Sequence, residues 1–293
     1  MKRLKSYHLL FQFVALPLLL ALTFYYKPKF DFSSFNLSFH FSFWIVILLM
    51  PFHWVIEFFK WKVVMKRQGL CIKIAKKSFA SGILSEFLIP GIPSNFLGRI
   101  LFFEKEERVE LSVWIQLANF TQFLVTLIFG LASMLYLNLS ISNNVIFFCC
   151  SLAFLVLLFL VSQKFNFINP LRDILNLSLF KKDSKSLYYL FFLSLLRFLF
   201  FSLQFGLLLH ALSISFDFTL FAYIWTSYLV VSFSPSLFLG NILVRESITV
   251  SIFQLGHYPV FPILTAAFCI WFINNLIPAC IAWMYLAVKN KIK

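Results

Sequence analysis

Charged side chains are scarce in this sequence. Only 12% of its 293 residues are Asp, Glu, Lys or Arg, whereas 61% are hydrophobic, and the mean hydropathy is +0.90. A soluble domain carries about twice that charged fraction, because its surface faces water. The composition therefore excludes an ordinary soluble domain and predicts an integral membrane protein.

Acidic side chains are the scarcer of the two charged kinds: 11 Asp and Glu stand against 25 Lys and Arg, which gives a formal net charge of +14. Most of the Lys and Arg lie in segments that would share one side of a membrane. Only Lys27 and Lys29 fall on the other side, and Arg99, Arg197 and Arg245 lie inside apolar runs. This asymmetry follows the positive-inside rule and places both ends of the chain in the cytoplasm. We therefore expect no nucleic-acid partner.

Patterns that would indicate catalysis or metal binding are absent from the sequence. The five cysteines show no metal-ligand spacing, and the five histidines form no i, i+4 pair. There is no Ser-His-Asp order and no Gly-rich nucleotide loop. We therefore expect no catalytic residue, no metal site and no cofactor, and we interpret the chain as not an enzyme.

Long apolar runs predict an all-α, polytopic transmembrane helical bundle, since about 20 apolar residues in a helix cross a bilayer. The expected spans are residues 8–26, 41–64, 111–137, 145–163, 187–212 and 260–288.

Two further apolar stretches, residues 78–103 and 218–255, are interrupted by Pro and Gly. In both, a Pro is followed by a small residue, an Asn and then an Arg four residues on. The paired positions are Ser94-Asn95 to Arg99 and Gly240-Asn241 to Arg245. Such paired interruptions are typical of a transporter site at a repeat interface. We expect two re-entrant hairpins, although two full spans in place of either hairpin would also fit the charge pattern.

The chain is predicted to form one membrane domain of two inverted repeats, with no soluble domain. The first half, residues 1–163, holds three spans, the first hairpin and the start of a fourth span. The second half, residues 164–293, holds the remaining spans and the second hairpin. Because three full spans is an odd number, the second repeat starts on the opposite side of the membrane, and the hairpins enter from opposite faces.

The Asn and Arg of each hairpin suggest an anion site. Asn95 and Arg99 are four residues apart and share one face of a helix, as do Asn241 and Arg245. A helix N-terminus with an Arg one turn along favours a cluster of anionic oxygens such as a phosphate. The structural alternative is that Asn caps the helix and Arg holds the hairpin through an ion pair.

Several acidic residues could supply that ion pair. A hairpin arginine would pair with Glu86 or Glu246, whereas Arg197 either adds a third positive group or pairs with Glu57 or Glu246. Glu57 lies close to Lys60 and Lys62, and we interpret it as part of a local surface ion pair. The candidate substrate-binding residues are Asn95, Arg99, Arg197, Asn241, Arg245, Glu246 and Glu86.

The two broken stretches resemble the motifs of the lysylphosphatidylglycerol synthetase transmembrane region, a flippase-like family of integral membrane proteins. The first motif is similar to Pro-Gly-x-x-Gly-Glu followed by an Arg, and the second to Gly-Gly-Leu-Gly-Val-Arg-Glu. The residues that match are Pro90, Gly91, Arg99, Gly240, Val244, Arg245 and Glu246. The residues that depart are Ser94 and Asn95, at the Gly and Glu of the first motif, and Asn241 and Leu243, at glycines of the second. Lys60-Trp61-Lys62 is also similar to a basic-Trp step of that family.

The resemblance implies a polytopic lipid translocase of the bacterial inner membrane, whose partner is a membrane lipid with an anionic headgroup. In synthetase members this region moves an aminoacylated lipid between leaflets. Asn95 in place of the acidic residue argues against a cation-recognising or proton-coupled step at that position. A second interpretation is a non-transporting scaffold or accessory subunit for a lipid- or glycan-modifying enzyme. A third is a membrane-embedded transferase, which would need a positioned acid or base. The oligomeric state and the lipid stay open.

Overall fold

The structure, a computed structural model, describes residues 41–67, 72–88, 94–138, 184–233 and 242–291. Within these ranges the chain forms helices joined by short turns and contains no strand. The predicted all-α class is therefore confirmed. The predicted spans 8–26 and 145–163 lie outside the described residues.

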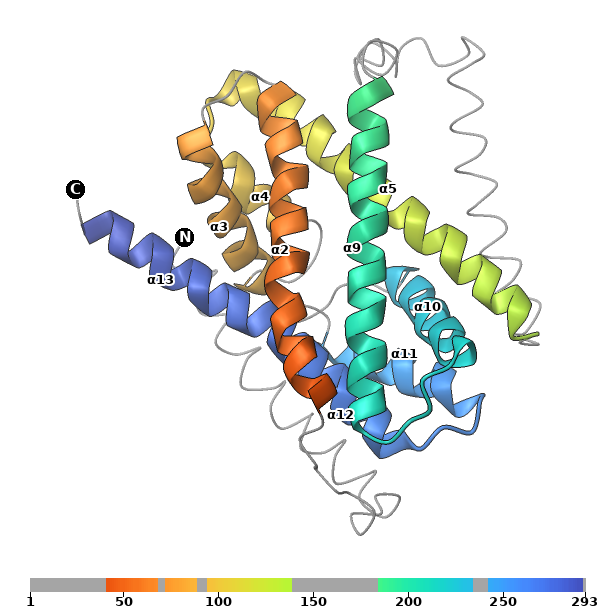
Figure 1. The fold of residues 1–293 in the computed structure, drawn as a ribbon. Helices are drawn as coiled ribbons and strands as arrows, with labels where there is room; N and C mark the ends of the chain where they lie inside the picture. The colour runs from red at the N-terminus through yellow and green to blue at the C-terminus, as the bar shows by residue number, and fades with distance from the viewer. Residues whose placement is uncertain (1–40, 68–71, 89–93, 139–183, 234–241, 292–293) are drawn as a thin grey trace, which may run out of the picture.

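The helices pack as a bundle with a short π-helical segment, η4, near its end (Figure 1). They are α2 (Phe41–Arg67), α3 (Ile72–Leu88), α4 (Ser94–Ile100), α5 (Lys105–Tyr136), α9 (Ser184–Ala211), α10 (Phe218–Phe233), α11 (Ile242–Gln254), α12 (Val260–Trp271), η4 (Phe272–Leu276) and α13 (Ile277–Lys291).

Four helical segments are long and apolar enough to cross a bilayer: Phe41–Lys66, Leu111–Tyr136, Lys185–Ala211 and Val260–Val288. They contain 26 to 29 residues, more than the roughly 20 that a span requires. They coincide with four of the predicted spans, so the chain is a membrane protein. α2 and α9 lie side by side and run in opposite directions through the middle of the bundle (Figure 1).

Each of the two broken stretches forms a pair of packed helices, α3 with α4 and α10 with α11. The open end of the α3–α4 pair lies at the upper end of the bundle in Figure 1, beside the end of α2. The open end of the α10–α11 pair lies at the lower end, beside the end of α9. This arrangement agrees with two hairpins that enter from opposite faces. The predicted boundary between the halves falls within residues 139–183, outside the described residues.

Two glycines allow α3 and α4 to approach each other closely. A Cβ atom on Gly98 would overlap Ser85 Oγ and the backbone of α3. A Cβ atom on Gly82 would lie 2.7 Å from Arg99 Cγ and 2.8 Å from Asn95 Oδ1. The two glycines therefore set the spacing of the helix pair and leave room for the two polar side chains on α4.

We expect Gly98→Ala to lower the free energy of unfolding by about 1–3 kcal/mol. The added methyl group would overlap the backbone of α3, which cannot move aside as a side chain can. Thermal unfolding of the detergent-solubilised protein measures this effect. Gly206→Ala is a matched control, since its Cβ would meet aromatic ring atoms, the nearest at 3.1 Å, that can shift. Equal, small losses of stability in both variants would contradict the close approach of α3 and α4.

The π-helical segment in the last span has a local cause. Pro278 has no N–H to donate to the carbonyl of Asn274, and its ring would clash with that carbonyl in a regular α-helix. The backbone N–H of Ile277 donates instead to the carbonyl of Phe272, five residues back. One proline therefore widens the helix by a residue at this point.

The wider turn supports a buried polar bridge between three spans. Asn274 Nδ2 donates to Gln204 Oε1 of α9 at 2.8 Å, and Gln204 Nε2 donates to the carbonyl of Val46 in α2 at 2.8 Å. Both amide side chains are buried. The bridge therefore fixes η4 against the antiparallel pair α2 and α9.

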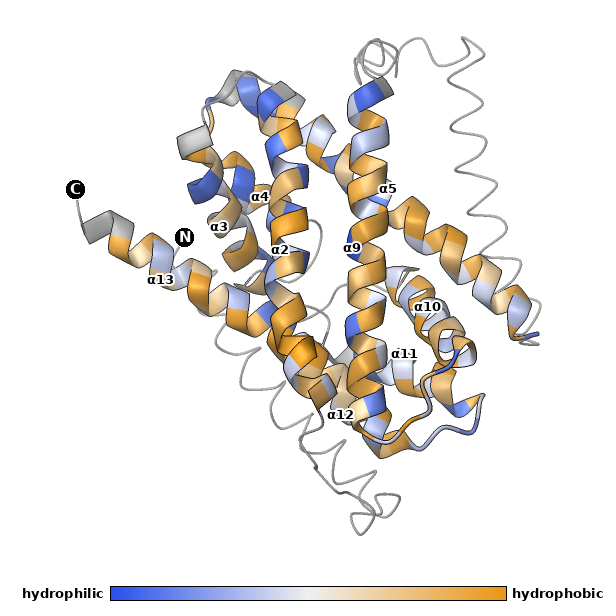
Figure 2. Ribbon diagram, viewed as in Figure 1, coloured by the Kyte–Doolittle hydropathy of each residue, from blue (hydrophilic) through white to orange (hydrophobic). Residues whose placement is uncertain are grey.

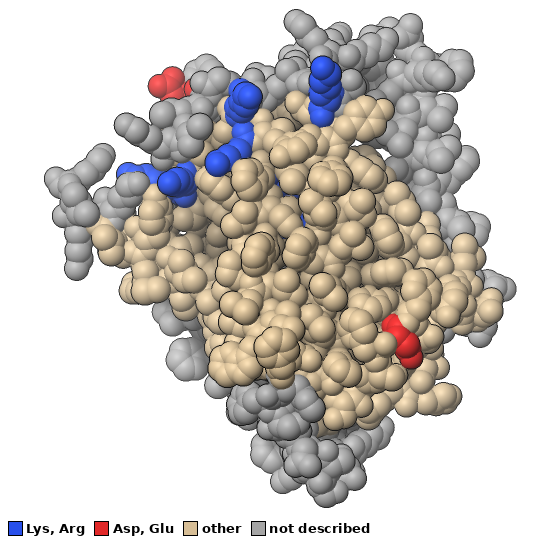
Figure 3. Space-filling view, in the orientation of Figure 1, with Lys and Arg blue, Asp and Glu red and all other residues tan. Residues whose placement is uncertain are grey.

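The face of the bundle seen in Figures 2 and 3 is apolar along its length and basic at one end. Figure 2 shows apolar residues along most of α2, α5, α9 and α12, with hydrophilic residues near the upper end. Figure 3 shows Lys and Arg gathered at that same end. The exposed large apolar side chains include Trp44, Leu48, Phe52, Phe192, Phe268 and Trp283. Such a surface suits a lipid environment with one basic interface.

Candidate functional site

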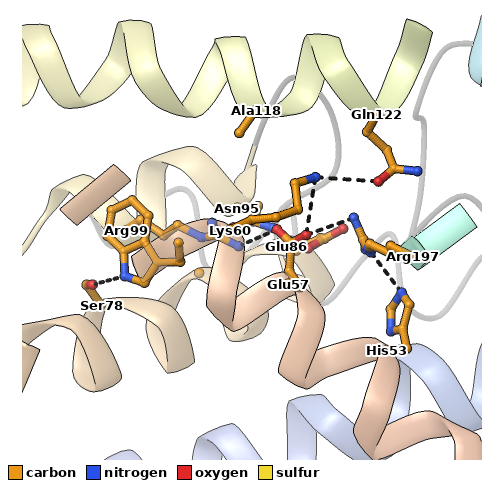
Figure 4. A network of polar contacts seen from close by, with 12 residues as sticks. His53, Glu57, Lys60, Ser78, Glu86, Asn95, Arg99, Ala118, Gln122 and Arg197 are labelled. Atoms are coloured by element: carbon orange, nitrogen blue, oxygen red, sulfur yellow. Dashed lines mark hydrogen bonds and ion pairs between the residues drawn. The ribbon is translucent and has the colours of Figure 1, made fainter. Parts of the chain in front are cut away.

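A buried carboxylate, Glu57 of α2, lies at the centre of the candidate site and is only 4% exposed. Its Oε1 atom lies 3.0 Å from Arg99 Nη2, and its Oε2 atom lies 3.0 Å from Arg197 Nη1 and 3.6 Å from Lys60 Nζ (Figure 4). These four residues are called the Glu57 cluster below. Three cations therefore converge on one carboxylate.

The cluster joins three helices through side chains that are distant in sequence. Glu57 and Lys60 lie one turn apart on α2, whereas Arg99 comes from α4 and Arg197 from the middle of α9. An ion pair inside a membrane protein is expensive to assemble and marks a functional position by default. The cluster is thus both a structural tie and the strongest candidate site in the described part of the chain.

Two cations of the cluster have further hydrogen-bond partners. Lys60 Nζ donates to Gln122 Oε1 of α5 at 3.4 Å. Arg197 Nε donates to His53 Nε2 at 2.9 Å, so this ring nitrogen carries no proton in this arrangement. Arg197 is the most accessible member, with 24% of its side chain exposed. A ligand could therefore reach Arg197 more easily than the other cations.

Arg99 is held more tightly than Arg197. Its guanidinium carbon lies 5.1 Å from the ring centroids of both Trp61 and Phe79. Trp61 is fully buried, and its Nε1 donates to Ser78 Oγ and to the carbonyl of Ala75, each at 3.1 Å. Two cation–π contacts and one ion pair position this guanidinium, which favours a structural role for Arg99.

The second carboxylate near the cluster, Glu86 of α3, accepts a hydrogen bond from Asn95 Nδ2 at 2.7 Å. Glu86 also lines a narrow pocket with Trp54, Ile83, Phe87 and Asn275. In the structural alternative, Arg99 would pair with Glu86 or Glu246, but the ion pair that the structure shows joins Arg99 to Glu57, across the bundle. Glu86 contacts the other member of the Asn-Arg pair instead.

The second hairpin places Arg245 beside the Glu57 cluster but outside its ion pairs, since Phe201 lies between Arg245 and His53, the residue that accepts a hydrogen bond from Arg197. The guanidinium of Arg245 lies over the ring of Phe201 of α9, 5.2 Å from its centroid. No ion pair joins Arg245 to Glu246 or to another carboxylate within the described residues. Asn241 lies outside the described residues. The structure thus brings Asn95, Arg99 and Arg197 into one region but does not bring Arg245 into that ion-pair network.

The interpretation of Glu57 as part of a surface ion pair is wrong, since the pair with Lys60 exists but is buried. The sequence carries a signal that would have located it. Glu57 is the only acidic residue in the apolar run 41–64, and such a residue faces the bundle interior rather than lipid. Of the two partners predicted for Arg197, the structure selects Glu57.

The chemistry available to this site is charge stabilisation. Lys60, Arg99 and Arg197 outnumber the carboxylate of Glu57, so the cluster has a surplus of positive charge that a bound anion would reduce. Within the described ranges, no group of three or more His, Cys, Asp and Glu side chains could hold a metal ion. The geometry thus supports anion binding.

Comparisons of this chain with protein-family models, with curated proteins and with solved structures find no match. The resemblance to the lysylphosphatidylglycerol synthetase transmembrane region therefore stays a prediction from its two motifs.

Proposed function

We propose that this protein is a flippase-like membrane protein that binds a lipid with an anionic, phosphate-bearing headgroup and moves it between leaflets. The observation that carries this proposal is the surplus of positive charge in the Glu57 cluster, inside an otherwise apolar bundle. A phosphate group would offset that surplus through charge-assisted hydrogen bonds. The paired helix breaks and the motif resemblance agree with a site at a repeat interface.

The three arginines have different roles in this proposal. Arg197 is partly exposed and Arg245 lacks a carboxylate partner among the described residues, so these two side chains contact the headgroup. Arg99, which is buried between two aromatic rings, positions Glu57 and the α3–α4 pair. Guanidinium groups suit this task because their planar donors match phosphate oxygens.

The proposed location is the cytoplasmic membrane of a bacterium, with both ends of the chain in the cytoplasm. The basic end of the bundle supports this orientation, because Lys and Arg gather there on the face that Figure 3 shows. The lipid would then meet the cluster from within the bilayer.

Reconstitution into liposomes tests the proposal. We expect purified protein to accelerate exchange between leaflets of fluorescent phosphatidylglycerol, whose headgroup has a net negative charge, more than that of a neutral glycolipid of the same chain length. A surplus of cationic groups favours the anionic headgroup, whereas hydrogen bonding alone would not distinguish them. The Lys66→Gln variant, which removes an exposed charge away from the cluster, is the matched control and should keep the wild-type rate.

The second candidate function is a non-transporting scaffold for a lipid- or glycan-modifying enzyme. The burial of Glu57 and its commitment to Arg99 favour this alternative, since a dry ion pair holds helices together without a ligand. Absence of both lipid binding and lipid exchange in correctly inserted protein would reject the flippase proposal and favour the scaffold.

A further inference from the structure

Glu246 of α11 is a buried carboxyl group with no visible partner. The residue is 6% exposed, and neither Oε1 nor Oε2 accepts a hydrogen bond from another residue in the part of the chain that the structure describes. Its neighbour Arg245 does not supply one, because that guanidinium lies over the ring of Phe201. The Glu57 carboxylate, by contrast, has three cations around it.

The elements around Glu246 offer it no other positive charge. α11 packs mainly against α10 and α12. Their titratable side chains are Tyr223, Tyr228 and Cys269, and none of these becomes a cation. Residues 234–241, which precede α11, contain no ionisable side chain in their sequence. Arg245 is therefore the one cation on this hairpin.

An ionised carboxylate in such surroundings would be destabilising, because burial removes its hydration and the nearby charge of Arg245 offsets only part of that loss. A neutral carboxylic acid avoids most of that cost. We propose that Glu246 is a proton-binding site, which takes a proton from hydronium to form an O–H bond when the side chain is buried as in this structure. The carboxyl group returns this proton to water when water reaches it.

The proton site is linked to the headgroup site through Arg245, and this step rests on the proposed function. An ionised Glu246 would compete with a bound phosphate for the neighbouring guanidinium, whereas a protonated Glu246 would not. Anion binding at Arg245 and proton binding at Glu246 therefore favour each other, and the linkage is reciprocal. When the lipid binds, Glu246 would therefore take up a proton or keep the one that it already holds.

Infrared spectroscopy tests the proton site without any lipid substrate. We expect wild-type protein in detergent at neutral pH to show a carboxylic-acid C=O band that shifts in deuterated water. Part of that band should be missing in Glu246→Gln, an isosteric change from one neutral group to another. Glu107→Gln, at the polar start of α5, should leave the band intact. An unchanged spectrum in a folded Glu246→Gln variant would overturn the proposal.

A binding measurement tests the link to the lipid. The phosphodiester of phosphatidylglycerol keeps its charge from mildly acidic to mildly alkaline pH, so it serves as the probe in nanodiscs. We expect wild-type affinity to fall by up to about tenfold for each unit of rising pH, the limit for one coupled proton. In Glu246→Gln the affinity should stay nearly constant, and an unaltered pH dependence in this variant would overturn the linkage.

The two experiments separate the two proposals. A Glu246-dependent acid band in protein that binds no phosphatidylglycerol at any pH supports the proton site and rejects the headgroup function. Lipid binding without that band supports the headgroup function and rejects the proton site.

Discussion

Glu57→Gln should lower the free energy of unfolding by about 3–5 kcal/mol, the largest loss expected from a single substitution in this protein. The change leaves Lys60, Arg99 and Arg197 without their shared carboxylate, and two of these cations are almost fully buried. Removing one partner of a buried ion pair is far more costly than replacing the whole pair, because the remaining charge is not compensated. Thermal or denaturant unfolding in a mild detergent measures the loss.

A double variant distinguishes this mechanism from a general packing defect. Glu57→Gln combined with Arg99→Met removes a buried charge of each sign and should recover a large part of the lost stability. Glu107→Gln is the control for loss of a carboxylate near the surface and should shift stability far less. Wild-type stability in Glu57→Gln would show that water or a bound anion, rather than Glu57, compensates the three cations.

The spans could be predicted because the length of an apolar run determines whether it can cross the bilayer. A run of about 20 apolar residues is long enough to cross the hydrocarbon core as a helix, whatever its partners are. Pro51 does not interrupt the prediction, since membrane helices tolerate proline where neighbouring helices compensate the lost hydrogen bond. The Pro-Gly breaks in the two remaining stretches likewise identify helix pairs from local sequence alone.

The partners of Asn95 and Arg99 could not be predicted in the same way, because they depend on which helices become neighbours. Asn95 and Arg99 lie on one short helix, as their spacing predicts, yet they contact different carboxylates. Asn95 binds Glu86 of the adjacent α3, whereas Arg99 binds Glu57, 42 residues away in sequence. Glycine at position 82 provides the space in which the Arg99 side chain extends. The local pattern thus specified the helix but not the partners across the bundle.

Trp61 shows a further limit of local reasoning. Trp61 belongs to the Lys60-Trp61-Lys62 step near the end of a predicted span. Trp residues at the ends of spans often lie at the membrane interface. The structure instead buries the whole indole between α2 and α3, where it donates to Ser78 and stacks on Arg99. The aromatic ring is therefore part of the support for the Glu57 cluster.

Arg197→Gln should weaken the binding of phosphatidylglycerol by about tenfold to a hundredfold, which corresponds to the roughly 1.5–3 kcal/mol of one charge-assisted hydrogen bond. The fold should survive, because Glu57 keeps Arg99 and Lys60 and because Arg197 is the accessible member of the cluster. Arg197→Lys keeps the charge but loses the planar set of donors, so its affinity should lie between those of the wild type and Arg197→Gln. Binding is measured by native mass spectrometry or by microscale thermophoresis in nanodiscs, with Lys66→Gln as the control for net charge. A stably inserted Arg197→Gln variant with wild-type affinity would show that this arginine serves only to hold Glu57 and His53, and the headgroup site would then have to lie at Arg245.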